Sequence, residues 1–234
     1  LESAMVSEGW QSADNETPSM GLTKSAYWFR VTLDYNEGEQ ALDRVLEIAY
    51  RDLAKVYVWF LTESSPRPEA IVTGSTLSLG DRPIHAATFA FPLELVPDEP
   101  VQILIRCVSD DALIVPVVLW SPEAFHEKER SQQIFEGCYY GILLVMFFYN
   151  AFLMVSMRER AYLFYCLYIF ATFFLQFIMD GGAHAYLYPD DDPDLGERMG
   201  LTRISIGVII FALALFTRDF LHLAERSPRQ NKII

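Results

Sequence analysis

Cys138–Val155, with the sequence CYYGILLVMFFYNAFLMV, decides how this chain is organised. These eighteen residues carry no charge, and only Gly141 and Asn150 fall outside the apolar set. An α-helix needs about 20 such residues to cross the ~30 Å of hydrocarbon in a lipid bilayer. The stretch therefore predicts a membrane-spanning helix, which we place at about residues 135–155.

Two further apolar runs follow, and we expect them to form helices at about 161–179 and 199–220. Polar side chains inside a membrane need partners, so Asn150 and Gln176 should face other helices. For Asn150 we favour a hydrogen bond between helices over a ligand contact. Arg203 lies one turn inside the third run and can extend to the water interface. The expected membrane domain is therefore residues 131–234.

The pair Gly137 and Gly141 has the four-residue spacing that lets two membrane helices approach closely. We favour packing inside one bundle, and we leave a homodimer of this chain open as the alternative.

The charges of the connecting segments predict an orientation. Residues 156–160 contain two Arg, whereas residues 180–198 contain six acids and one Arg. The segment after residue 220 is again basic, with Arg226, Arg229 and Lys232. Because cationic flanks stay in the cytoplasm, we expect a cytoplasmic C-terminus and an extracytoplasmic N-terminal domain.

The acidic run Asp190–Asp194 suggests calcium, but it lacks the EF-hand pattern. Counted from Asp190, the Gly and Glu required at loop positions six and twelve are Leu195 and Leu201. We therefore expect a solvated turn and no metal site.

The N-terminal domain, residues 1–130, is strongly acidic. It has 10 Lys and Arg against 21 Asp and Glu, a net charge of −11. A nucleic-acid partner is not expected, because phosphate binding needs a basic face. The chain starts at Leu1 and has no basic, apolar leader, so we expect a fragment that lacks an upstream targeting sequence.

Short runs of β-forming residues alternate with turn clusters in this domain, which is typical of a β-sandwich. The expected strands are Tyr27–Leu33, Val45–Ile48, Val56–Leu61, Ile71–Thr73, Thr88–Leu95, Val101–Val108 and Leu113–Leu119. A helix over Leu42–Tyr50 is the alternative to the second strand.

Three candidate ligand-binding residues stand out. Tyr57 and Trp59 share one face of a strand, because side chains alternate along it. They are the best candidates for an aromatic platform, and His85 is the third candidate. For Trp28, Trp59 and Trp120 we favour packing in the sandwich interior over sugar stacking.

No catalytic motif occurs: the His-Glu-x-x-His, Gly-x-Ser-x-Gly and phosphate-loop patterns are all missing. We therefore expect no enzyme activity and no cofactor in this segment. A glycoside hydrolase would need paired carboxylates in a cleft, which the sequence does not test.

Six segments together resemble a known family. They are 21–33 and 103–106, then 115–122, and in the membrane half 140–153, 158–165 and 180–189. In order and spacing they are similar to the bacterial seven-transmembrane receptors with diverse intracellular signalling modules.

The resemblance implies a jelly-roll sandwich, related in shape to carbohydrate-binding modules, followed by seven helices and a cytoplasmic output module. The sequence holds three of those seven helices. The implied protein is a receptor in the bacterial inner membrane that senses a small molecule, with a carbohydrate or related metabolite favoured. The alternative is a membrane-anchored module that binds a periplasmic protein. A membrane-tethered glycan hydrolase ranks third.

Overall fold

The computed structural model describes residues 9–12, 15, 17–36, 38–75, 77, 82–109, 112–180, 182 and 200–221. The chain divides into two compact units, Leu1–Glu129 and Arg130–Ile234, and each is described by itself. The acidic run 190–194 and the basic residues 226–232 lie outside the described residues.

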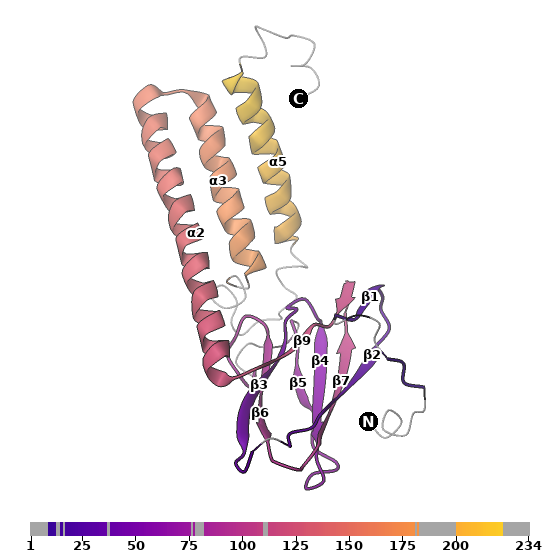
Figure 1. Cartoon of the computed structure of the whole chain (residues 1–234). Helices are drawn as coiled ribbons and strands as arrows, with labels where there is room; N and C mark the ends of the chain where they lie inside the picture. The colour runs from indigo at the N-terminus through magenta and orange to yellow at the C-terminus, as the bar shows by residue number, and fades with distance from the viewer. Residues whose placement is uncertain are drawn as a thin grey trace. The chain divides into compact units, whose positions relative to one another are not determined.

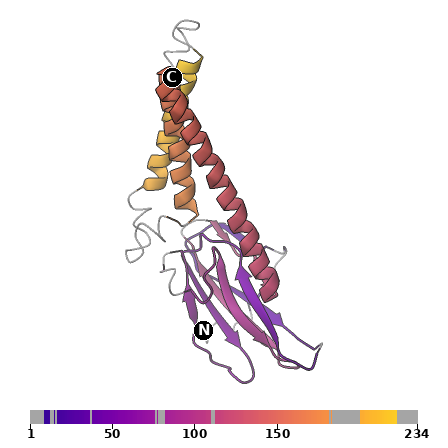
Figure 2. The same ribbon diagram turned by 90° about the vertical axis from the view of Figure 1, so that its left-hand side faces the viewer.

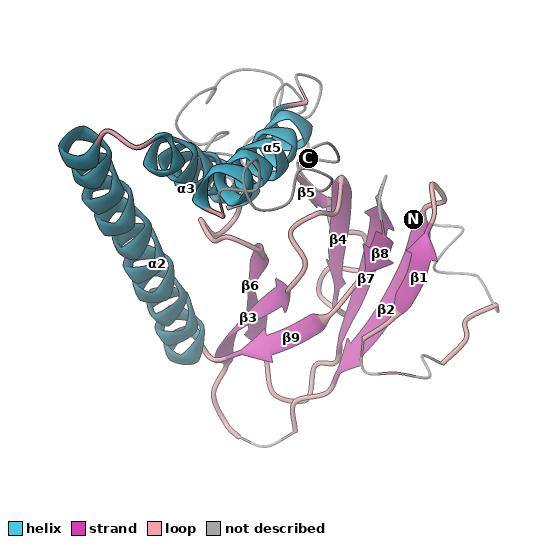
Figure 3. Cartoon of the chain, turned by 90° about the horizontal axis from the view of Figure 1, so that it is seen from above, coloured by secondary structure: helices cyan, strands magenta, loops and turns pink. Residues whose placement is uncertain are grey.

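The first unit is built from β-strands, which Figures 1 and 3 label. They are β1 Ser19–Leu22, β2 Tyr27–Leu33, β3 Leu42–Ile48, β4 Lys55–Leu61, β5 Ile71–Thr73, β6 Phe89–Leu95, β7 Val101–Val108, β8 Ala112–Ile114 and β9 Val117–Trp120. The four-stranded sheet has the order β2-β7-β4-β5, and the three-stranded sheet has the order β6-β3-β9. All their pairings are antiparallel. The predicted β-sandwich is confirmed, and its jelly-roll character stays a prediction.

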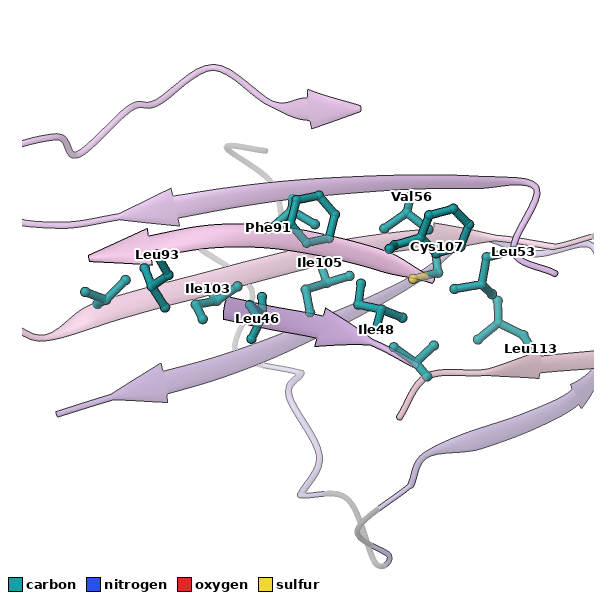
Figure 4. Packing of buried hydrophobic residues seen from close by; sticks show 14 of the residues in the cluster. Leu46, Ile48, Leu53, Val56, Phe91, Leu93, Ile103, Ile105, Cys107 and Leu113 are labelled. Atoms are coloured by element: carbon teal, nitrogen blue, oxygen red, sulfur yellow. The ribbon is translucent and has the colours of Figure 1, made fainter. Parts of the chain in front are cut away.

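The core lies between these two sheets. Val56 and Val58 of β4, Ile103 and Ile105 of β7, and Phe91 of β6 are all fully buried there. Figure 4 shows residues of both sheets meeting in this layer. Side chains alternate between the two faces of a strand, so the residues between these core positions face outward. The residues that form the core therefore also determine which residues form the two outer faces of the sandwich.

Three sequence expectations need correction. The strand predicted over Leu113–Leu119 is two strands, because Pro116 lies between β8 and β9 and has no N–H for a ladder. The alternative helix over Leu42–Tyr50 is wrong, since β3 pairs with both β6 and β9. The short strand β1, which pairs with β8, was not expected.

The described part of the chain contains three helices that are long and apolar enough to cross a membrane. They are α2 Pro122–Met157, α3 Arg160–Met179 and α5 Leu201–Phe220. Figures 1 and 2 show them. Helix α2 begins 13 residues ahead of the expected start at 135. Residues 122–134 are mostly polar and charged, so a search for apolar runs does not detect that they belong to the same helix.

Within the second unit, aromatic side chains join the helices. Tyr140 and Phe147 of α2 contact Phe173 and Phe170 of α3, with ring centroids 5.2 and 6.4 Å apart. Helix α3 packs along α5, where the rings of Tyr165 and Phe216 are 5.2 Å apart. Several aromatic residues of 161–179 therefore make contacts between helices.

Candidate ligand-binding site

The outward face of the four-stranded sheet carries a cluster of aromatic rings. Tyr57 and Trp59 alternate along β4 with the core residues Val56 and Val58, so they share the face that points away from the interior. Trp28 of β2 joins them from the other side of β7. The structure thus adds a third ring to the two that the sequence singled out.

The three rings lie nearly parallel. The centroids of Trp28 and Trp59 are 5.2 Å apart with an interplanar angle of 20°, and those of Tyr57 and Trp59 are 6.1 Å apart at 13°. Leu104 of β7 and Leu61 of β4 are buried beside them. The result is a stack of three rings, which we call the aromatic floor. Its central ring, Trp59, is 9% exposed, so the partly exposed surfaces of Trp28 and Tyr57 are what it offers to flat ring compounds and to the apolar faces of sugars.

Two arginines and a fourth ring border this floor. The guanidinium of Arg106 lies 5.1 Å from the ring centre of Tyr57, and that of Arg30 lies 4.6 Å from the ring centre of Trp10. Trp10 comes from the segment 9–12 and packs against the aromatic cluster. Its Nε1–H is buried and has no acceptor in the described part of the chain.

The expectation that Trp28, Trp59 and Trp120 are core residues holds for Trp59, which is 9% exposed in a buried cluster, whereas Trp28 and Trp120 are only partly buried. Each holds an outward position on its strand, and none belongs to the cluster between the sheets. Composition alone favours the interior for tryptophan, but the alternation of the neighbouring apolar residues assigns the opposite face. That alternation was present in the sequence and could have given the correct side.

The outward face of the three-stranded sheet has a different content, a fully buried carboxylate. Glu47 of β3 has no exposed surface. It accepts hydrogen bonds from Thr88 Oγ1 at 2.5 Å, from Trp120 Nε1 at 2.7 Å and from the ammonium of Lys128. Three donors, one of them cationic, compensate for the loss of water around this charge.

The first turns of α2, which belong to the first unit, cover this carboxylate. Phe125 of α2 is buried against Val45 and Ala90 of the sheet. The Lys128 ammonium lies 5.6 Å from the ring centre of Phe125 and 5.9 Å from that of Trp120. We call Glu47, Thr88, Trp120 and Lys128 the Glu47 cluster, and it fixes the beginning of α2 to β3.

His85, the third candidate, does not join Tyr57 and Trp59. It is exposed on the loop before β6, and its neighbours Ile84 and Ala86 pack against the Phe125 cluster on the other sheet. In the same loop, burial lowers the pKa of Arg82, whose Nη1 donates to the carbonyl of Ala86. The sequence does not indicate which layer this loop covers.

The three polar residues singled out in the membrane helices have different surroundings. Gln176 donates to Asp180 Oδ1 at 2.9 Å, and Tyr140 of α2 donates to Asp180 Oδ2 at 2.5 Å. Asn150 donates to the carbonyl of Met146 in its own helix, instead of the expected bond between helices. Arg203 is exposed in the first turn of α5.

Sequence reasoning missed Glu47, Arg30, Arg106 and Trp10. Glu47 is an acid between apolar residues of a strand. An acid at an outward strand position is usually exposed to solvent, so the sequence did not indicate that it is buried. The cover provided by α2 comes from residues about 80 positions later in the chain, and only the folded structure brings it there. In the described residues, no group of three His, Cys, Asp or Glu side chains could hold a metal ion.

Residues 2–121 match the family described as 7TMR-DISM extracellular 2, and residues 132–234 match the family described as 7TM diverse intracellular signalling. The first match covers about half of the chain, and the two together cover nearly all of it. No curated protein and no solved structure matches the chain.

Proposed function

Because the chain belongs to the family of seven-transmembrane receptors with diverse intracellular signalling, we propose that its extracytoplasmic sandwich binds a small molecule and passes that event to the membrane helices. A carbohydrate is the favoured ligand class. The proposal includes a bacterial inner membrane and a cytoplasmic C-terminus, supported by the basic and acidic segments between the helices.

The aromatic floor of Trp28, Tyr57 and Trp59 is the observation that carries the proposal. Carbohydrates bind to proteins through the apolar faces of their rings as well as through hydrogen bonds, and flat side chains provide the matching surface. In the described residues, neither a metal cluster nor a catalytic motif competes with this assignment. The cluster lies outside the layer between the two sheets, and its partly exposed members Trp28 and Tyr57 are the part that a ligand can reach.

The Glu47 cluster supports the second half of the proposal. Helix α2 continues from Lys128, which pairs with Glu47, into the apolar run that starts at Cys138. A ligand shifts a conformational equilibrium only as far as its affinity differs between the two states. A rigid attachment of the first turns of α2 to β3 would make the helix respond when ligand binding changes the sandwich.

The test uses the whole chain in detergent micelles, titrated with a panel of neutral and acidic oligosaccharides. Near-ultraviolet circular dichroism measures the thermal midpoint of the sandwich. We expect at least one sugar to raise this midpoint in a saturable way. Trp59→Leu should abolish the rise, because it removes the central ring. Trp59→Phe is the matched control, since it keeps an aromatic face and should retain binding.

The competing outcome separates the alternative function. If no sugar raises the midpoint, and the chain instead captures one defined protein from a periplasmic extract with saturable binding, the sandwich is a protein-binding module. Turnover of an oligosaccharide during the titration would favour the hydrolase reading.

A further inference from the structure

The outward positions of the four-stranded sheet have a charge opposite to that of the domain around them. On β2, β4, β5 and β7 these positions carry three cations, Arg30, Lys55 and Arg106, and neither Asp nor Glu. Residues 1–130 as a whole have 10 basic and 21 acidic residues. The aromatic floor is therefore a locally positive surface on a strongly negative domain.

Neither Arg30 nor Arg106 pairs with a carboxylate in the described part of the chain. Their contacts are the flat faces of Trp10 and Tyr57. A guanidinium that stacks on a ring keeps its N–H groups directed sideways, free for a carboxylate. Stacking also holds the side chain in place, so less entropy is lost when an anion binds.

The two arginines are close enough to act on one ligand. Arg30 pairs with Leu104 in the ladder, and Arg106 lies two residues along β7 on the same face. Such diagonal neighbours are about 7–8 Å apart at their Cα atoms, within the span of one sugar residue and its substituents.

We propose that this face selects acidic sugars, in which a carboxylate is attached to the ring that packs on the partly exposed surfaces of Trp28 and Tyr57. The inference rests on the proposed sugar-binding function and specifies its ligand class. Arg30 and Arg106 bind the carboxylate, and the aromatic floor binds the ring. The net charge of the domain repels anions at long range, so the local cations give selectivity at contact distance.

The test compares two probes that share one sugar backbone and differ only at the carboxyl groups. One is a short oligogalacturonate, and the other is the same oligomer with every carboxylate methyl-esterified. Binding to the whole chain in detergent is measured by calorimetry at low salt. We expect the acid to bind about 10-fold tighter or more, which corresponds to one charge-assisted contact. Added salt should reduce this ratio.

Variants assign the selectivity to the arginines. Arg30→Gln combined with Arg106→Gln should bring the ratio of the two affinities close to one. Arg106→Lys keeps the positive charge and should preserve most of the preference for the acid over the ester. It replaces the double Gln variant as the test if that variant does not fold. Lys24→Gln removes an exposed cation outside the sheet and is the matched control, for which we expect an unchanged ratio.

The outcomes separate the two proposals. Equal affinity for the acid and the ester, or selectivity that persists in the double variant, overturns the acidic-sugar inference and leaves sugar binding intact. Binding of neutral sugars without any binding of the acid overturns it as well. If no sugar of either charge binds, the proposed function itself fails, and the inference fails with it.

Discussion

The two outer faces of one sandwich carry opposite charges and have opposite environments. The four-stranded sheet presents Arg30, Lys55 and Arg106 with no acid at its outward strand positions. The outward positions of the three-stranded sheet include Asp43, Glu47 and Glu94, and no cation. The same alternation of side chains produced both faces.

The difference lies in what satisfies the charges. Glu47 is compensated from within the chain, by Lys128, Trp120 and Thr88, and is closed off by the first turns of α2. Arg30 and Arg106 each stack on an aromatic ring, have no carboxylate partner among the described residues, and remain open to solvent on part of their surface. A closed charge serves stability and attachment, whereas an open charge on an apolar floor serves recognition.

Removing the closed charge should have the largest effect. Glu47→Ala leaves Lys128, Trp120 Nε1 and Thr88 without their acceptor, and we expect a loss of about 3–5 kcal/mol in unfolding free energy. For a domain of this size that corresponds to a fall of roughly 10–20 °C in the thermal midpoint. Near-ultraviolet circular dichroism of the chain in detergent measures it.

Glu94→Ala is the control for this variant, because Glu94 is an exposed acid on the adjacent strand β6. It should change the thermal midpoint very little. Equal midpoints for the two variants would mean that the Glu47 cluster contributes nothing to attachment.

Lys128→Met should have a smaller effect. It removes the ammonium but keeps the apolar stem, and Glu47 retains two neutral donors. The Lys128 side chain is 30% exposed, so water screens the pair, and we expect a loss of about 1–2 kcal/mol. A double-mutant cycle with Glu47→Gln should give a coupling energy above about 0.5 kcal/mol. Additive losses would show that the two side chains do not act together.

Arg106→Gln should lower stability less than either change in the Glu47 cluster. Its contact with Tyr57 is a partly exposed cation–π contact, worth about 0.5–1 kcal/mol. The thermal midpoint should therefore stay within a few degrees of the unmutated chain. A loss as large as that of Glu47→Ala would contradict the contrast between the faces, because it would make Arg106 a structural charge.

An exposed acid, Glu99, gives the smallest effect and a dependence on pH. The backbone N–H of Ser64 donates to Glu99 Oε1 at 3.1 Å, and this lowers the pKa of Glu99 below its ordinary value of 4.5. The stabilisation is therefore present above pH 4.5 and is lost as the pH falls through the folded-state pKa.

The measurement is the difference in thermal midpoint between the unmutated chain and Glu99→Gln. It should be small and positive at neutral pH and should shrink to zero in acid. A difference that grows on acidification would contradict the direction of the pKa change.

Strands with strong alternation were predicted well, and those without it were not. The predicted limits of β2, β5 and β7 agree with the structure, because each run is bounded by turn residues. The four-residue β1 is too short to show an alternating pattern, and the predicted strand continued across Pro116 instead of ending there. Of the candidate site, Tyr57 and Trp59 were found by their spacing, whereas His85 belongs to a loop on the opposite sheet.

The sequence by itself determined the sandwich, the three apolar helices and the boundary between them near residue 130. These features depend on composition and on periodicity within short segments. The tertiary structure decided which charges are covered. Whether Glu47 meets water or Lys128 depends on where α2 lies, and whether Arg106 meets a carboxylate depends on strands far away in the chain. Those are long-range contacts, and no local pattern encodes them.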